Sequence, residues 1–256
     1  MLAIIGGTGV YQLLGESEER ELRTPYGDVT VTLSRLANGR EVIFAPRHGK
    51  GHSVPPHRLP SRALLFGLHE AGVRAILSTS AVGALSTDLA PGTLALLGDF
   101  MDFTKSRETT FHNGPDVVHQ DVTEAYCPTL RGALRDTAKE LGIALHPRDV
   151  VYVCTEGPRF ETPSEIRAYR MLGGDVVGMT QVPEVVLARE LGIHYAGVAL
   201  VTNLAAGVEG SRPSHREVLE LMAHSGETVS RLLLGCAERV GEGPACNQCE
   251  VPEGMS

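Results

Sequence analysis

Short apolar runs alternate with amphipathic segments along most of this chain, and this alternation restricts its fold more than any single motif does. Strands are predicted at Ala3–Ile5, Ala75–Leu77, Thr93–Leu97, Val150–Cys154, Val176–Val177 and His194–Val201. Helices are predicted at Ser61–Ala71, Thr129–Leu141, Ser164–Leu172, Pro183–Leu191 and Arg216–Val240. Strands that alternate with helices indicate an α/β fold, in which helices flank a central twisted β-sheet.

Two more predicted strands, Thr30–Leu36 and Arg40–Ala45, flank an Asn38-Gly39 turn and are typical of a β-hairpin. A hairpin adds an antiparallel pair, so we expect a mixed sheet. Residues 99–127 are polar with little apolar period, and they are predicted to be irregular. No linker or repeat divides the chain, so we expect one domain over residues 1–240 and a flexible tail over residues 241–256.

The formal net charge of −8 argues against a nucleic-acid partner or an anionic membrane surface, because either would require a basic face. No apolar run approaches the roughly 20 residues that cross a bilayer. No cationic leader precedes an apolar stretch at the start, so we expect a cytoplasmic protein. A small anionic substrate held by one or two arginines remains compatible with this charge.

The cysteines are too few and too scattered for a disulfide framework. Cys246 and Cys249 are the one closely spaced pair in the sequence, and two such thiolates can share a metal ion. A tetrahedral zinc site needs about four ligands, however, and the sequence has no second pair. We therefore expect no metal site and interpret these thiols as incidental.

Groups that can hold an anion follow three of the predicted strands. Gly6–Gly9 contains Thr8, Arg47 and His48 follow the hairpin, and Ser80 lies just beyond Ala75–Leu77. Amides, hydroxyls and a guanidinium are donors that a phosphate accepts. Each motif alone has an ordinary structural explanation, such as a tight turn or a surface arginine. Together they favour a phosphate site.

The stretch from Glu156 to Glu184 contains groups that suit a flat heterocycle. Phe160 offers a face for stacking, although a lone phenylalanine more often belongs to the core. The adjacent Glu161 is harder to explain structurally, because a carboxylate beside an apolar wall needs a partner. Asn203, at the end of a predicted strand, would reach the same region, because α/β sheets bind ligands at the carboxyl ends of their strands.

The ordered motifs resemble those of the trimeric purine nucleoside phosphorylase and methylthioadenosine phosphorylase family. They are IIGGTG at 4–9, TPYG at 24–27, RHG at 47–49, STSAVGAL at 78–85, EGPRFET at 156–162, VVGMTQVPE at 176–184 and TN at 202–203. The resemblance implies a homotrimer that cleaves purine nucleosides reversibly with phosphate as co-substrate and without metal or organic cofactor.

The same resemblance assigns roles to particular residues. It implies phosphate contacts from Thr8, Arg47, His48, Ser80, Ala81 and Thr180. It implies a ribose contact from Met179 and purine contacts from Phe160, Glu161, Val177 and Asn203. His119 matches a position that reaches into the site of a neighbouring subunit. Asn203 and His48 are the candidate catalytic residues.

Asn203 and Glu161 predict which base is bound. Methylthioadenosine phosphorylases carry aspartate at the position of Asn203 and again two residues later, where this chain has Ala205. An amide can donate to a 6-oxo oxygen or to N7, whereas a carboxylate only accepts. Glu161 can accept from N1–H, which hypoxanthine and guanine carry and adenine lacks. The pair therefore favours 6-oxopurine nucleosides such as inosine and guanosine.

Three alternatives remain open. If His215 does not reach the 5′-hydroxyl, the substrate would be 5′-methylthioinosine or 5′-methylthioadenosine. A dinucleotide-dependent reductase could use Gly6–Gly9, but the third glycine of that fingerprint is missing, and so is an acidic residue at the end of a second strand near position 30. A purine-binding module without catalysis would not need Arg47, His48 and Ser80 together.

Overall fold

The computed structural model describes residues 1–6, 17–49, 51, 53–115, 117–240 and 246. The described helices are α1 Ser61–Glu70, α2 Pro128–Leu141, α3 Pro163–Met171, α4 Gln181–Glu190 and α5 His215–Val240. The described strands are β1 Leu2–Gly6, β2 Ser17–Thr24, β3 Gly27–Arg35, β4 Glu41–Pro46, β5 Ala75–Ala84, β6 Leu94–Phe103, β7 Val150–Thr155, β8 Val176–Gly178 and β9 His194–Leu204.

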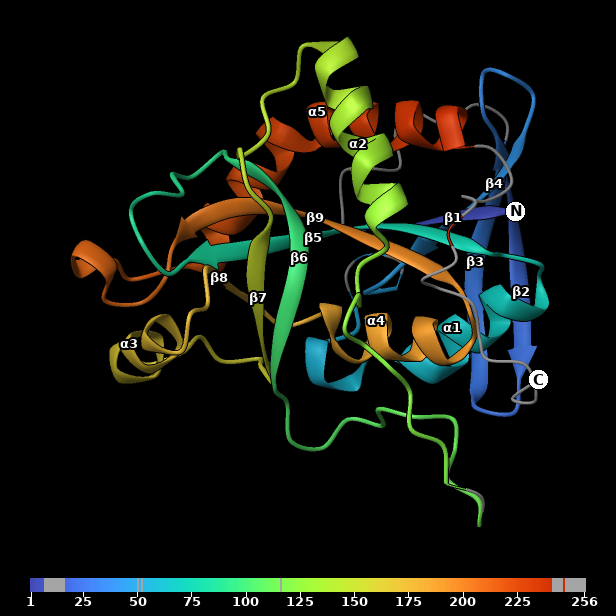
Figure 1. Ribbon diagram of the computed structural model, residues 1–256, viewed down its shortest axis with the longest axis horizontal. Coiled ribbons are helices and arrows are strands. Elements are labelled where there is room, and N and C mark those ends of the chain that lie inside the picture. Colours follow the sequence, from blue (N-terminus) through green and yellow to red (C-terminus); the bar gives the residue numbers. More distant parts are fainter. Residues whose placement is uncertain (7–16, 50, 52, 116, 241–245, 247–256) are drawn as a thin grey trace.

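Within these ranges the strands form one sheet in the order β2-β3-β4-β1-β5-β8-β7-β6-β9. Strand β9 also pairs in parallel with β5, so the segment from β5 to β9 closes on itself. Helices α2 and α5 cover one face, and α1 and α4 cover the other (Figure 1). The predicted α/β class with a mixed sheet is confirmed.

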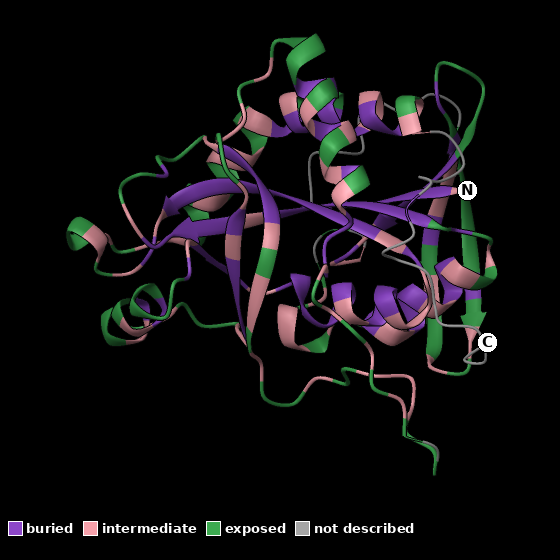
Figure 2. Cartoon of the chain, viewed as in Figure 1, coloured by how far each residue is buried: buried purple, intermediate pink, exposed green. Residues whose placement is uncertain are grey.

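The central strands are apolar along both faces because helices cover both sides of the sheet. Every residue of β1 is buried, and so are most residues of β5 and β9. Figure 2 shows the buried centre of the sheet between helices whose outer faces are exposed. This rigid centre holds the carboxyl ends of β5, β8 and β9 in fixed positions.

Strand β2 was not predicted from the sequence, and it adds a third strand to the predicted hairpin. The pairing of β3 with β4 confirms the hairpin, but β2 extends it by one antiparallel strand. Strand β2 reads SEERELRT and buries only Leu22, so it has no apolar alternation to detect. Charged residues are typical of an edge strand, where they discourage pairing with another chain.

Three strands continue beyond their predicted ends. Strand β5 includes Ser80, and β9 includes Thr202 and Asn203, so these polar residues lie within strands and not after them. Strand β6 runs to Phe103, so the prediction that residues 99–127 are wholly irregular is wrong for their first part. Pairing with β7 explains the extension, because it supplies backbone hydrogen bonds that an apolar pattern does not reveal.

Two predicted features lie at the limits of the described residues. Thr8 falls outside them, and so does most of the predicted tail, residues 241–245 and 247–256. Cys246 is described, and its side chain packs against the core cluster beneath α2 and α5. Among the described helices, none is both long and apolar enough to cross a membrane.

Candidate active site

A cavity of about 420 Å³ lies at the carboxyl ends of β5, β8 and β9, beside the start of α5. The structure brings most of the predicted site residues to its walls: Arg47, His48, Ser80, Ala81, Phe160, Glu161, Val177, Met179, Thr180, Asn203 and His215. These residues come from segments far apart in the sequence. The sheet, the chain before α3 and the start of α5 together place them around one space.

Arg47 is held by a buried ion pair. Its Nε donates to Oε1 of Glu184 at 2.6 Å and its Nη2 donates to Oε2 at 3.0 Å. Its Nη1 donates to the carbonyl of Thr79 at 2.6 Å, and the side chains of Arg47 and Glu184 are 2% and 1% exposed. Burial disfavours the charge on Arg47, but Glu184 outweighs this effect and raises its pKa. Arg47 is therefore a fixed, paired cation rather than a surface arginine.

Glu184 is a site residue that the sequence analysis did not assign. Its Oε2 also accepts a hydrogen bond from the hydroxyl of Tyr195 at 2.7 Å. Burial raises the pKa of Tyr195 well above its ordinary value, so the phenol stays protonated and can donate. A carboxylate within the otherwise apolar start of α4 was the available signal, because a buried charge requires a partner.

A pair of hydroxyls lies on the cavity wall next to Arg47. The Oγ of Ser80 and the Oγ1 of Thr180 are 2.9 Å apart. The Nε2 of Gln181 donates to Ser80 at 2.7 Å and to the buried Ser78 at 2.9 Å. Because Gln181 supplies the proton that Ser80 accepts, a hydroxyl proton of the pair can be donated into the cavity. Such donors suit an oxyanion.

Contacts with the backbone fix the positions of His48 and Thr180 at this end of the cavity. The Nδ1 of His48 lies 2.9 Å from the carbonyl of Val54, so this nitrogen carries a proton. A side chain at Gly178 would lie 2.3 Å from the hydroxyl of Tyr152. That hydroxyl accepts from the backbone N–H of Thr180 at 3.1 Å, so glycine allows tyrosine to fix Thr180.

At the other end of the cavity, Glu161 and Phe160 precede helix α3. A capping box fixes the start of this helix, with reciprocal hydrogen bonds between Thr162 and Glu165. The Oγ1 of Thr155 donates to Oε1 of Glu161 at 2.6 Å. Burial raises the pKa of Glu161, although the bond from Thr155 opposes this effect. Phe160 is 38% exposed, which leaves its ring available to a ligand.

Asn203 has a fixed amide orientation. The hydroxyl of Thr202 donates to its Oδ1 at 2.9 Å, and its Nδ2 donates to the carbonyl of Leu204 at 2.9 Å. The carbonyl of Val82 lies 3.2 Å from the same hydroxyl, so the two acceptors share its single proton. Each polar atom of the amide keeps one further hydrogen-bonding position. Asn203 can therefore donate to a ligand and accept from it.

The start of α5 forms the outer wall of the cavity. His215 lines it together with Val218, Leu219 and Met222. This wall combines one polar ring with three apolar side chains. It can border a hydroxyl group or an apolar substituent.

Arg107 supports both ends of the site from outside the cavity. Its Nη1 donates to the carbonyl of Val182 at 2.6 Å, and its Nη2 donates to those of Thr155 and Glu156 at 3.0 and 2.8 Å. The residue therefore connects the chain before Glu161 to the chain after Thr180. It lies in the polar region 99–127, where the sequence offered no pattern to identify it.

His119 does not line this cavity. It is exposed, on the long connection between β6 and α2, and it borders a separate surface depression of about 400 Å³. In Figure 1 this connection extends away from the sheet beyond α4. Thr110 and Phe111 anchor it to Glu190 through two hydrogen bonds of 2.7 Å.

The cavity therefore has two chemically different ends. One end offers hydroxyl, imidazole and guanidinium donors, and its arginine is already balanced by Glu184. The other end offers an aromatic face, a carboxylate and an amide. An anion and a flat polar heterocycle could bind at the same time, with space between them for a third group.

Comparison with known proteins gives a consistent result. Residues 1–238 match the model of the Phosphorylase superfamily. The chain is 49% identical over 263 aligned positions to a 6-oxopurine nucleoside phosphorylase of Pyrococcus furiosus, with 100% of this chain and 98% of that protein covered. It is also 49% identical to a probable S-methyl-5′-thioinosine phosphorylase of Methanopyrus kandleri, with 99% and 98% covered.

Solved structures show the same similarity. The structure of an adenosine/methylthioadenosine phosphorylase mutant from Schistosoma mansoni, in complex with methylthioadenosine, superposes with a TM-score of 0.88. The sequence identity is 34%, and the match covers 95% of this chain and 92% of that one.

Proposed function

Because this chain belongs to the Phosphorylase superfamily, we propose that its cavity cleaves 6-oxopurine nucleosides with phosphate. The enzyme is a pentosyltransferase. Phosphate adds to C1′ of the ribose, and the bond from C1′ to N9 breaks with its electron pair going to the purine. The products are the free base and ribose 1-phosphate, so inosine yields hypoxanthine. The observation that carries this proposal is that Glu161 and Asn203 both line the cavity, at the end proposed for the base.

The proposed transition state is positive on the sugar and negative on the departing base. Phosphate bound by Ser80, Thr180, Ala81, Arg47 and His48 would act both as nucleophile and as the anion that stabilises the sugar cation. Thr8, outside the described residues, is proposed as a further phosphate contact. Met179 and Val177 would border the ribose and the base. No metal or organic cofactor is proposed for this reaction.

The departing purine needs a hydrogen bond at N7 or O6, and we assign this donor to the amide of Asn203. The carboxylate of Glu161 would accept N1–H, and Phe160 would stack on the ring. Adenine carries no hydrogen on N1, so the same carboxylate would find no partner there. The proposed base preference therefore follows from hydrogen-bond complementarity.

A side-by-side assay of inosine, guanosine, adenosine, 5′-methylthioinosine and 5′-methylthioadenosine tests this function. We expect phosphate-dependent release of hypoxanthine from inosine to exceed adenine release from either adenine nucleoside. Faster release of adenine from methylthioadenosine would contradict the proposal. The second candidate is 5′-methylthioinosine, which the apolar side chains of Val218, Leu219 and Met222 beside His215 favour.

Loss of the Ser80 hydroxyl should weaken phosphate use selectively. A hydrogen bond to a charged group contributes about 1.5–3 kcal/mol, so Ser80→Ala should lower kcat/KM for phosphate by about 10- to 100-fold. Steady-state kinetics at saturating inosine measure this effect. Ser78→Ala is the matched control, because Ser78 accepts from the same Gln181 but does not line the cavity. Equal effects of the two variants would contradict a phosphate contact.

The raised pKa of Glu161 predicts the acid limb of the pH profile. The carboxylate must be ionised to accept N1–H, so activity should fall as the pH drops through the pKa of Glu161. Burial raises that pKa, which places the limb above the ordinary range for glutamate. In Glu161→Gln the limb should disappear from the profile of kcat/KM for inosine, and the remaining activity should be lower. If the acid limb is unchanged in Glu161→Gln, a group other than Glu161 causes it.

We further propose a cytoplasmic homotrimer. The exposed position of His119 on a connection that extends from the molecule supports a contribution to a neighbouring subunit's cavity.

A further inference from the structure

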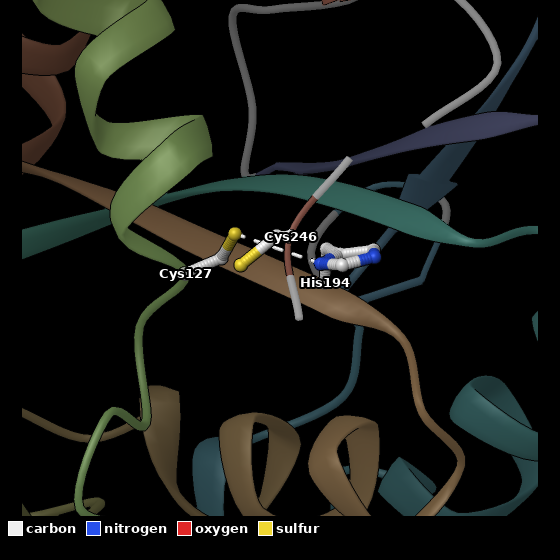
Figure 3. Close-up of side chains that lie close together, drawn as sticks. All are labelled: Cys127, His194 and Cys246. Carbon is white, nitrogen blue, oxygen red and sulfur yellow. Dashed lines mark hydrogen bonds between the residues drawn. The ribbon is translucent and has the colours of Figure 1, made fainter. Parts of the chain in front are cut away.

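Cys127, His194 and Cys246 lie together at the opposite end of β9 from the cavity. One Sγ or ring nitrogen atom from each residue lies within 4.8 Å of those from the other two. Figure 3 shows the two sulfur atoms beside each other, with one ring nitrogen of His194 on the side of the imidazole that faces them. The sequence analysis found one pair of closely spaced cysteines and no second pair of ligands. The tertiary structure brings Cys127 and His194 beside Cys246.

The scaffold holds Cys127 and His194 rigidly. Cys127 immediately precedes α2, and its backbone N–H donates to the carbonyl of Tyr195 at 2.8 Å. His194 begins β9, and its N–H donates to the carbonyl of Arg74 at 3.0 Å. Cys246 then approaches from the chain beyond α5. Two ligands are thus set by the sheet, and the third is brought by the segment that follows the last helix.

The measured geometry suits a tetrahedral zinc ion. The Sγ of Cys127 and the Nδ1 of His194 are 3.6 Å apart. Bond lengths of about 2.3 Å for Zn–S and about 2.0 Å for Zn–N separate two tetrahedral ligands by about 3.6 Å. Cys127 is fully buried, Cys246 is 8% exposed and His194 is partly buried, so both thiols are largely shielded from water.

We propose that Cys127, His194 and Cys246 bind Zn²⁺. These residues supply two thiolates and one imidazole, and a water molecule can take the fourth position of a tetrahedral ion. Binding releases the thiol protons to solvent, so affinity rises with pH.

The role of this site is structural. It joins the chain beyond α5 to the start of α2 and the start of β9. Thr202 at the cavity lies eight positions after His194 along β9, which is roughly 26 Å of strand. The metal ion therefore contributes to folding stability and takes no part in phosphorolysis.

The test uses the full-length protein, purified with reductant and without an affinity tag that binds metal. Elemental analysis should find one zinc ion per chain. Replacing zinc with Co²⁺ should give the thiolate-to-cobalt charge-transfer absorption and the strong visible bands of a tetrahedral site. Removing the metal with a chelator should lower Tm, and adding Zn²⁺ should restore it.

Variants separate the ligands from other cysteines. Cys246→Ser and His194→Asn should each weaken zinc binding on the order of 100-fold or more, and each should remove the cobalt spectrum of the wild-type site. Cys236→Ala is the control, because Cys236 is equally buried but outside the cluster. Inosine phosphorolysis should be retained in Cys246→Ser.

Two results would overturn the proposal. One is zinc binding by the wild-type protein that is no tighter than by Cys246→Ser. The other is a mass lower by two hydrogens per chain, with Cys127 and Cys246 joined in one peptide under non-reducing digestion and no metal bound by the reduced protein. That second result would identify the cluster as a disulfide. Neither result would bear on the proposed phosphorylase activity.

Discussion

Replacing Asn203 with aspartate should shift the base preference from 6-oxopurines toward 6-aminopurines. The change removes the N–H that donates to O6 or N7 and supplies an oxygen that accepts from a 6-amino group. It also places a carboxylate oxygen where Nδ2 now donates to the carbonyl of Leu204, so the inosine reaction loses a positioned donor. We expect the ratio of kcat/KM for adenosine to that for inosine to rise by about 100-fold or more.

Thr202→Val is the control for this shift. It removes the hydroxyl that holds Oδ1 of Asn203 but keeps the amide itself. The control should lower both activities and leave their ratio close to that of the wild type. A folded Asn203→Asp protein with an unchanged ratio would show that Asn203 does not select the base.

Replacing Glu184 with glutamine should cause the largest loss of stability. The guanidinium of Arg47 is almost fully buried, and Glu184 provides its only carboxylate among the ion pairs of the described residues. Removing one partner leaves an uncompensated buried charge, which costs about 3–5 kcal/mol. For a chain of this size we expect Tm to fall by about 6–20 °C. Thermal unfolding followed by circular dichroism measures this shift.

Glu140→Gln is the matched control, because Glu140 makes an equally well-aligned pair with Arg239 on the surface. Exposed pairs contribute about 0–1 kcal/mol, so this variant should unfold near the wild-type temperature. The double variant Arg47→Met with Glu184→Gln should recover part of the lost stability, because it removes the buried charge. Equal Tm values for Glu184→Gln and Glu140→Gln would contradict a buried, essential pair.

The chain's apolar periodicity was enough to predict most of the fold. The five long helices and the central strands were found because their burial imposes a repeat on the sequence. Strand β2 was missed because its side chains are charged and exposed, and its pairing depends on the backbone of β3. The extension of β6 to Phe103 was missed for the same reason. Backbone hydrogen bonds do not impose a repeat of apolar side chains on the sequence, so they are hard to predict from it.

The candidate site was predicted only in part. The proposed phosphate donors and base contacts that line the cavity were named in advance because their motifs follow predicted strands. Glu184, Gln181 and Arg107 were not assigned, because each acts through a residue distant in the sequence. The partner of Arg47 is 137 positions away, and that of Ser78 is 103 positions away. Such pairings follow from the order of strands in the sheet.

The sequence by itself determined the α/β class, and it supplied the proposed donor groups for an anion and the amide proposed to favour a 6-oxopurine. These depend on local pattern and on the chemistry of single side chains. The tertiary structure decided that Arg47 is balanced by Glu184, and that Cys127 and His194 meet Cys246. Both results depend on which strands are neighbours. Neighbouring strands are chosen by the packing of the whole sheet, which no short segment encodes.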